Sequence, residues 1–152
     1  MATESLWPTE FPDLPESSPV VILRAQGDAL GAITHGVVVG RVVPFSVPGV
    51  PVIGPGGEVF AVGGPNRLVN TFQLYVPALD YSYDLLIVSH TAVQYPADVF
   101  RMYEGAERLG ANPQRASSEE QFVQLLRSVF ASREVGRIVQ LLRQEAAAAP
   151  QQ

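Results

Sequence analysis

The residues best suited to chemistry lie between positions 80 and 90. Asp80 and Asp84 flank a short run that contains Tyr81 and Tyr83, and His90 ends the apolar segment that follows. Two neighbouring carboxylates can act as general acid and base if burial raises the pKa of one of them. One hypothesis is therefore a small-molecule-binding or hydrolytic domain with its site around Asp80, Asp84 and His90.

The same residues also have a structural interpretation, which we favour. Ser89 and His90 are adjacent in an expected strand, so their side chains point to opposite faces and cannot pair as nucleophile and base. Asp80 and Ser82 are typical turn residues. The only other histidine is His35, and the chain has no cysteine, so metal-ligand spacing is absent. We expect no catalytic residue, no metal site and no cofactor.

Two glycine-rich segments, residues 54–57 and 63–66, resemble phosphate-binding loops only in their glycine content. A phosphate-binding loop needs a Gly-Lys-Ser/Thr sequence that runs into a helix, and a dinucleotide loop needs a strand before it and a helix after it. This chain contains no lysine, and strands are expected after both segments. These glycines are therefore interpreted as turn residues.

A different class of function, a surface for another protein, is indicated by residues 1–17. This segment holds four acidic residues and no basic one, and its prolines prevent a helix: Glu4, Glu10, Asp13, Glu16, Pro8, Pro12 and Pro15. It nevertheless carries Trp7 and Phe11. The sequence leaves two alternatives open, a disordered leader and an extended arm whose aromatic residues anchor on this domain or on a neighbouring subunit.

Further apolar and aromatic residues outside the expected core support the same hypothesis. Residues 46–67 are rich in proline and glycine but too apolar for a free linker, so we expect a long loop packed on the domain, with a short strand near 59–62. Tyrosine offers rigid contact area at little entropic cost. The predicted partner-binding residues are Trp7, Phe11, Val52, Ile53, Phe60, Tyr81, Tyr83 and Tyr95.

Composition limits the classes of function. Hydrophobic residues make up 47% of the 152 residues and charged residues 16%, which indicates one globular domain, expected at 18–147, with an unusually apolar surface. The net charge of −5 argues against nucleic acid and anionic membranes as partners. No apolar run approaches the ~20 residues of a membrane span. The acidic first residues do not resemble a signal peptide, so a cytoplasmic location is expected.

Helices are predicted at both ends of this domain. Ser18 and Pro19 begin the first, which ends at His35, and its glycines at 27 and 31 form a smooth stripe for close packing. Ser117 with Glu120 is expected to form the capping box of a second helix, and Ser132 to cap a third. One-sided apolar stripes predict that both C-terminal helices bury against a sheet and meet at an angle: Phe122, Leu126 and Phe130 on one, Val135, Ile138 and Leu142 on the other. A short tail, residues 148–152, follows.

Strands are expected at 37–45, 68–76, 83–90 and 93–101. Gly40 is a candidate for a bulge, and Pro96 predicts an edge strand or a bulge. Residues 83–90 are apolar at neighbouring positions, which is typical of a strand covered on both faces. Residues 104–115 are expected to form a polar loop.

Together these patterns predict an α+β fold. An antiparallel sheet of four or five strands is covered by the N-terminal helix and the C-terminal helix pair. The function favoured by the sequence is a non-enzymatic protein-interaction or assembly module, either a homo-oligomer or a subunit of a larger complex. Its partner is then a protein, which is either a second copy of the chain or another subunit.

Overall fold

The computed structural model describes residues 4–44, 51–53, 59–61, 66–104 and 113–150. The helices in these residues are α1 (Pro19–Ile33), α2 (Glu119–Phe130) and α3 (Arg133–Ala148), with short 3-10 turns at η1 (Pro77–Leu79) and η2 (Met102–Glu104). The strands are β1 (Val39–Pro44), β2 (Pro51–Ile53), β3 (Val59–Ala61), β4 (Arg67–Val76), β5 (Tyr81–Thr91), β6 (Ala97–Arg101) and β7 (Gln114–Ala116).

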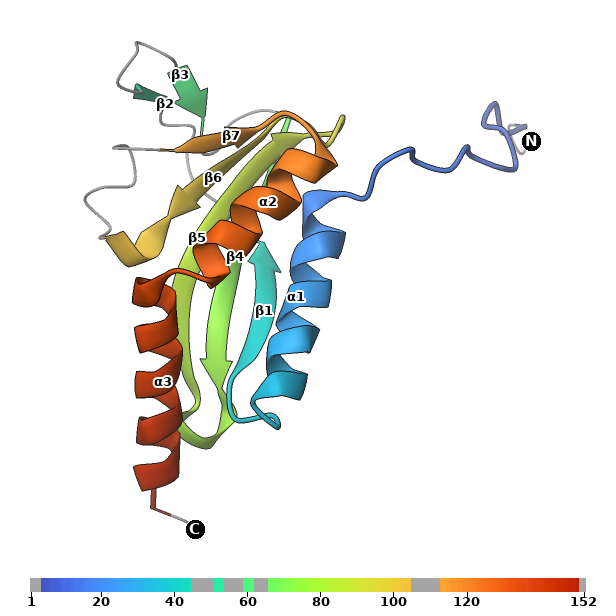
Figure 1. The fold of residues 1–152 in the computed structure, drawn as a ribbon. Coiled ribbons are helices and arrows are strands. Elements are labelled where there is room, and N and C mark those ends of the chain that lie inside the picture. Colours follow the sequence, from blue (N-terminus) through green and yellow to red (C-terminus); the bar gives the residue numbers. More distant parts are fainter. Residues whose placement is uncertain (1–3, 45–50, 54–58, 62–65, 105–112, 151–152) are drawn as a thin grey trace.

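The predicted α+β fold is confirmed. The described strands form a five-stranded antiparallel sheet in the order β1-β4-β5-β6-β7, and β2 pairs with β3 separately. Figure 1 shows α1 beside β1, while α2 crosses in front of the sheet and α3 runs down its side. The angle between α2 and α3 is the corner predicted from the break at Ser132, whose hydroxyl accepts a hydrogen bond from the Val135 amide at 3.3 Å.

Strand β5 is buried on both faces from Leu85 to His90, as its apolar sequence predicts, whereas its first residues are exposed. Leu86 and Val88 face the helices with Phe72, their neighbour on β4, whereas Ile87 points to the opposite face. All of these side chains are buried in the single chain. The pairing register shifts between Phe72 and Gln73, which leaves Leu85 as the extra residue of a bulge in β5.

Gly40 is not a bulge, contrary to prediction, because it pairs in regular register with Leu74. This position requires glycine for a different reason, the lack of space for a side chain. A Cβ atom on Gly40 would lie 2.5 Å from the Cα of Gly27 and 2.6 Å from the ring of Phe72. The close packing predicted for the α1 glycine stripe is therefore real, and its partner is the backbone of β1.

Pro96 lies outside the strands, so the prediction that it marks an edge strand is wrong. The Tyr95–Pro96 peptide bond is cis and belongs to the turn before β6, which begins at Ala97. β6 is also an inner strand because β7 pairs with it. Sequence analysis did not predict β7. The strand has only three residues, Gln114, Arg115 and Ala116, which are mostly polar and show no strand pattern.

The cap of α2 is displaced by one residue from its prediction. Ser118, rather than Ser117, is the N-cap, and its hydroxyl accepts a hydrogen bond from the Gln121 amide at 3.2 Å. The side-chain oxygen of Gln121 accepts a hydrogen bond from the amide of Ser117, the residue before the cap, at 2.8 Å. The arrangement resembles a capping box with glutamine in the role assigned to Glu120, except that the amide bonded by the glutamine side chain belongs to Ser117 and not to the N-cap Ser118.

Candidate functional site

The three residues of the predicted acid–base site do not meet. Asp80 and His90 stand at opposite ends of β5, and this separation corresponds to about 30 Å along an extended strand. Asp84 is exposed on the sheet face away from the helices, whereas His90 is buried on the helix side. The structure therefore gives no common site to Asp80, Asp84 and His90.

The two aspartates belong to an exposed polar ladder across β1, β4 and β5. Tyr75 donates its hydroxyl proton to Asp80 at 2.9 Å, and this hydrogen bond raises the pKa of Tyr75. Gln73 donates to Asp84 at 2.8 Å and accepts from Arg41 at 3.2 Å. The Arg41 guanidinium also lies 3.9 Å from the centre of the Tyr75 ring. Each polar group thus has a structural partner.

His90 is bonded to the backbone, in line with the structural interpretation. Its Nδ1 lies 2.7 Å from the carbonyl oxygen of Thr91, to which the tautomer protonated at Nδ1 donates. Its buried Nε2 has no hydrogen-bond partner within the part of the chain that the structure describes. The group that orients the ring is therefore a backbone carbonyl, whereas a catalytic histidine of a Ser-His-Asp triad is oriented by a carboxylate.

A charge cluster around a buried carboxylate, on the sheet face away from the helices, was missed by sequence analysis. The Asp98 carboxylate, 2% exposed, accepts from Arg115 Nε at 2.8 Å and Arg67 Nη2 at 3.3 Å. Arg67 also donates to the hydroxyl of Ser89 at 2.7 Å. These four residues come from β4, β5, β6 and β7, so the cluster ties neighbouring strands together.

The predicted partner-binding residues fall in different environments. Tyr81 is exposed, and Tyr83 is half-buried against the core, which raises its pKa. Tyr95 is buried, at 9% exposed, so the prediction that it contacts a partner is corrected. In the two-stranded sheet, Val52 pairs with Phe60 and Ile53 with Val59. The side chains of Val52, Ile53 and Phe60 lie outside the described residues.

Tyr95 instead fixes the base of the acidic arm. Its hydroxyl donates to the carbonyl oxygen of Ser17 at 2.9 Å, and burial raises its pKa to about 12. Glu16 accepts from the Glu119 amide at 2.7 Å, which places a carboxylate at the positive N-terminus of α2. The Ser17 amide donates to the Glu119 carboxylate at 3.0 Å.

Beyond this base the arm leaves the domain. Figure 1 shows the chain before α1 as an extended segment that projects away from the sheet and helices. Trp7 is 76% exposed and Phe11 66%, and their ring centres lie 6.2 Å apart. Leu6 and Leu14 are also exposed. The aromatic residues therefore contact each other but do not anchor on the domain of their own chain.

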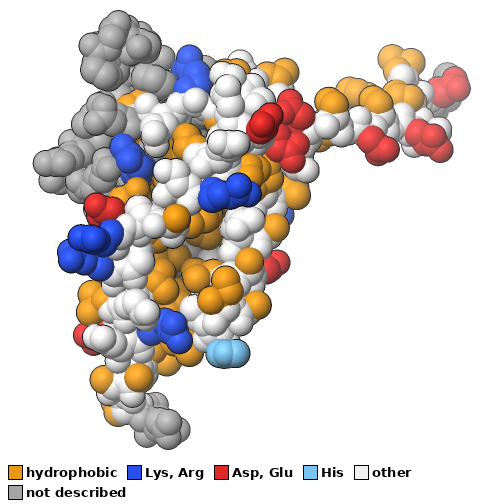
Figure 2. All heavy atoms as spheres, in the orientation of Figure 1, with side chains coloured by type: hydrophobic (Ala, Val, Ile, Leu, Met, Phe, Trp, Pro, Cys, Tyr) orange, Lys and Arg blue, Asp and Glu red, His pale blue; other side chains and the backbone are white. Residues whose placement is uncertain are grey.

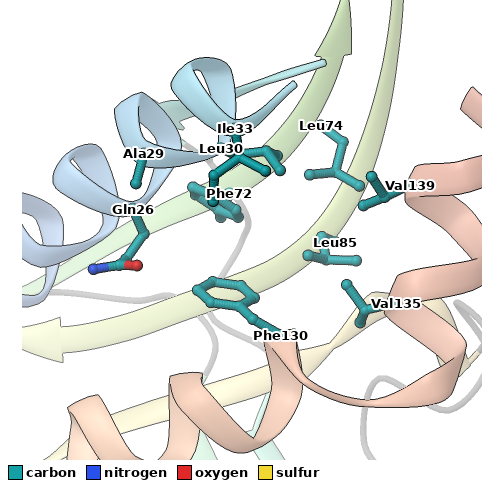
Figure 3. Close-up of a pocket in the computed structure, with 10 residues that line it drawn as sticks. All are labelled: Gln26, Ala29, Leu30, Ile33, Phe72, Leu74, Leu85, Phe130, Val135 and Val139. Carbon is teal, nitrogen blue, oxygen red and sulfur yellow. The ribbon is translucent and has the colours of Figure 1, made fainter. Parts of the chain in front are cut away.

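An apolar groove lies between α1 and the C-terminal helices (Figure 3). Its volume is about 210 Å³. Leu74 and Leu85 of the sheet form part of its floor, and Phe130 of α2 contacts Phe72 with ring centres 5.7 Å apart. The lining residues are Gln26, Ala29, Leu30, Ile33, Phe72, Leu74, Leu85, Phe130, Val135 and Val139. We call this set the helix groove.

The helix groove exists because the helices cover the sheet incompletely. Ile22 and Gln26, in the first half of α1, line a hollow together with residues of α2, while α2 and α3 diverge from the corner at Ser132. Phe130, predicted as core, is therefore only half-buried, and Ile33 remains 72% exposed. Sequence analysis identified the apolar residues but had no means to show that no other helix covers them.

Arginine side chains border the helix groove. The hollow that continues along α3 is lined in part by Arg133, Arg137 and Arg143, and the hollow beside α2 by Arg127. None of the described residues that line these three hollows is acidic. Figure 2 shows hydrophobic side chains gathered between the helices with basic side chains beside them. This surface is suited to an apolar ligand that carries negative charge.

Comparison of the chain with protein-family models, with curated proteins and with solved structures finds no match. Function is therefore inferred from this geometry alone. Within the described residues, no three histidine, aspartate or glutamate side chains are grouped so that they could hold a metal ion. No helix there has the length and apolar character needed to cross a bilayer.

Proposed function

We propose that this chain is a non-enzymatic assembly module that associates with further copies of itself. The observation that carries this proposal is the presence of two uncovered apolar surfaces on one small domain, the arm with Trp7 and Phe11 and the helix groove. Large aromatic side chains left in water are costly, and they are enriched at the centres of protein interfaces.

The chemistry of the remaining candidate residues also favours assembly. Asp80, Asp84 and His90 lie apart, and the buried Asp98 is held by Arg67 and Arg115 across neighbouring strands. A site for acid–base catalysis needs groups within hydrogen-bond reach of a common substrate. The Asp84 and Asp98 carboxylates instead join strands, and the Tyr95 hydroxyl and Glu16 carboxylate hold the arm.

Sedimentation velocity of the full chain over a hundredfold range of concentration tests the proposal. We expect discrete species larger than the monomer, whose fraction falls on dilution because association follows mass action. A chain that remains monomeric over the whole range would contradict self-assembly. A continuous distribution of large species would also contradict it, because it indicates aggregation through unspecific apolar contact.

A further inference from the structure

We infer that the helix groove of one copy binds the arm of a second copy, in a reciprocal exchange of arms. The inference rests on the proposed self-assembly and specifies its interface. Trp7 is the residue that we assign to the groove. A cavity of about 150 Å³ can hold a benzene ring, so the volume of about 210 Å³ admits an aromatic side chain.

The arm has the backbone of a preformed ligand. Trp7, Phe11 and Leu14 each precede a proline, and the residue before a proline is restricted to extended or polyproline conformations. Such a segment loses little conformational entropy when it binds, and grooves with aromatic walls recognise it in other proteins. Here Phe72 and Phe130 supply the aromatic walls.

The polar groups of the arm and the groove are also complementary. Gln26 is the polar side chain among the groove residues, and its amide oxygen is an acceptor for the indole N–H of Trp7. Glu4 and Glu10 lie on either side of Trp7 in the sequence, while arginines border the groove. Each exposed ion pair contributes only about 0–1 kcal/mol, but together they orient the approach of the arm.

The arm that occupies a groove comes more readily from a second copy than from the same chain. The contacts of Glu16 and Ser17 with Glu119 fix the start of the arm at the N-terminus of α2. From that point the arm runs away from the helices of its own chain (Figure 1), and Pro15 holds Leu14 in an extended conformation that opposes an immediate reversal. A neighbouring molecule needs no such reversal.

The area involved is sufficient for a stable dimer. Trp and Phe side chains each bury about 150–250 Å², so two exchanged arms that each dock both Trp7 and Phe11, with the walls that they cover, would remove about 1,200–2,000 Å² from water. This range is that of specific protein–protein interfaces. Exchange in both directions also closes the assembly at two copies, since each arm and each groove is then occupied.

Two variants and two matched controls test the inference. Trp7→Ala removes the proposed anchor, and Ile33→Glu places a negative charge in the groove that should receive an acidic arm. Both residues are exposed in the monomer, so neither change should unfold it. Val93, which is also 72% exposed but lies in the turn after β5, supplies the controls Val93→Ala and Val93→Glu.

We expect Trp7→Ala and Ile33→Glu each to weaken dimerisation by about a hundredfold or more, because every dimer loses two anchoring contacts. Both controls should dimerise as the original chain does. Trp7 is the only tryptophan, so its fluorescence emission should shift to shorter wavelength as the original chain dimerises. Mixing the two weakened variants should restore dimers of intermediate strength, since one arm and one groove remain intact in the mixed pair.

The other outcomes separate this inference from the proposed function. If the chain dimerises and neither variant affects the dimer, self-assembly holds and the arm–groove contact is wrong. A monomer whose Trp7 emission is already shifted and does not change with dilution would mean that the arm folds onto its own groove, which contradicts the inference and self-assembly together. Failure of the mixed variants to associate would rule out reciprocal exchange.

Discussion

Gly27 of α1 and Gly40 of β1 meet backbone to backbone: a Cβ atom on Gly27 would lie 2.5 Å from the carbonyl oxygen of Gly40. This contact sets how closely α1 can approach the edge strand of the sheet. It therefore also fixes the position of one wall of the helix groove, since Gln26 and Leu30 flank Gly27 on the same helix.

Substitution of Gly27 by alanine should lower stability although alanine is the better helix former. Alanine gains about 1 kcal/mol in helix propensity, but the backbone of Gly40 cannot yield to the new methyl group, and overpacking costs about 1–3 kcal/mol. Gly136 of α3 is the matched control, because a Cβ atom added there would meet no described atom within 4 Å. We expect Gly136→Ala to stabilise the protein, as measured by urea unfolding, and equal responses at the two sites would contradict the packing argument.

Asp98 should contribute far more to stability than Asp84, although both lie on the same face of the sheet. Asp98→Ala removes the carboxylate that Arg67 contacts in a largely buried site, and breaking a buried ion pair costs about 3–5 kcal/mol. Asp84→Ala removes an exposed contact with Gln73, so we expect a change below about 1 kcal/mol. Unfolding midpoints of the two variants check this contrast, and a similar loss in both would show that the cluster is not a structural tie.

The fold could be predicted well where a segment carries its own pattern. The consecutive apolar residues of β5 require cover on both faces, and the stripes on α2 and α3 define the faces that meet the sheet. By contrast, β7 is a strand only because β6 pairs with it. Its three mostly polar residues give no indication of that distant partner. The edge of the sheet was therefore assigned to β6, which is an inner strand.

The candidate site was harder to predict because the helix groove depends on which apolar side chains are left without a covering helix. An apolar stripe on α1 or α2 shows which residues avoid water, but not whether another helix lies over them. Phe130 was expected in the core because it belongs to the apolar stripe of α2, although no helix in the described part of the chain covers it fully. Tyr95 was expected on the surface, but it is buried and contacts the Ser17 carbonyl. This contact depends on where the arm crosses the β5–β6 turn, and no local sequence pattern encodes that crossing.

Tyr95 should make the protein less stable at alkaline pH. Its pKa is raised from 10.0 to about 12 in the folded state, so between these values the folded protein binds the proton more strongly than the unfolded chain. Stability is therefore retained below about pH 10 and falls as the pH rises toward 12. Tyr75 and Tyr83 shift in the same direction, so they add to this fall.

Tyr95→Phe isolates the contribution of this tyrosine. At neutral pH it removes the hydrogen bond to Ser17, for which we expect a loss of about 1 kcal/mol. Between about pH 10 and 12 its stability should fall less steeply than that of the original chain, because the group that titrates is gone. Urea unfolding across this pH range measures the two slopes, and identical slopes would mean that Tyr95 does not titrate differently in the folded state.

Phe122 and Phe130 occupy the same face of α2 but should respond differently to truncation. Phe122 is fully buried, with its ring centre 6.2 Å from that of Tyr95, so Phe122→Ala should cost about 3–5 kcal/mol. Phe130 is half-buried at the helix groove, so less area is returned to water and a smaller cavity remains when it is truncated. We expect Phe130→Ala to cost about half as much in urea unfolding and to weaken dimerisation in sedimentation. If it destabilises the monomer as strongly as Phe122→Ala, Phe130 is a core residue and not a wall of a docking site.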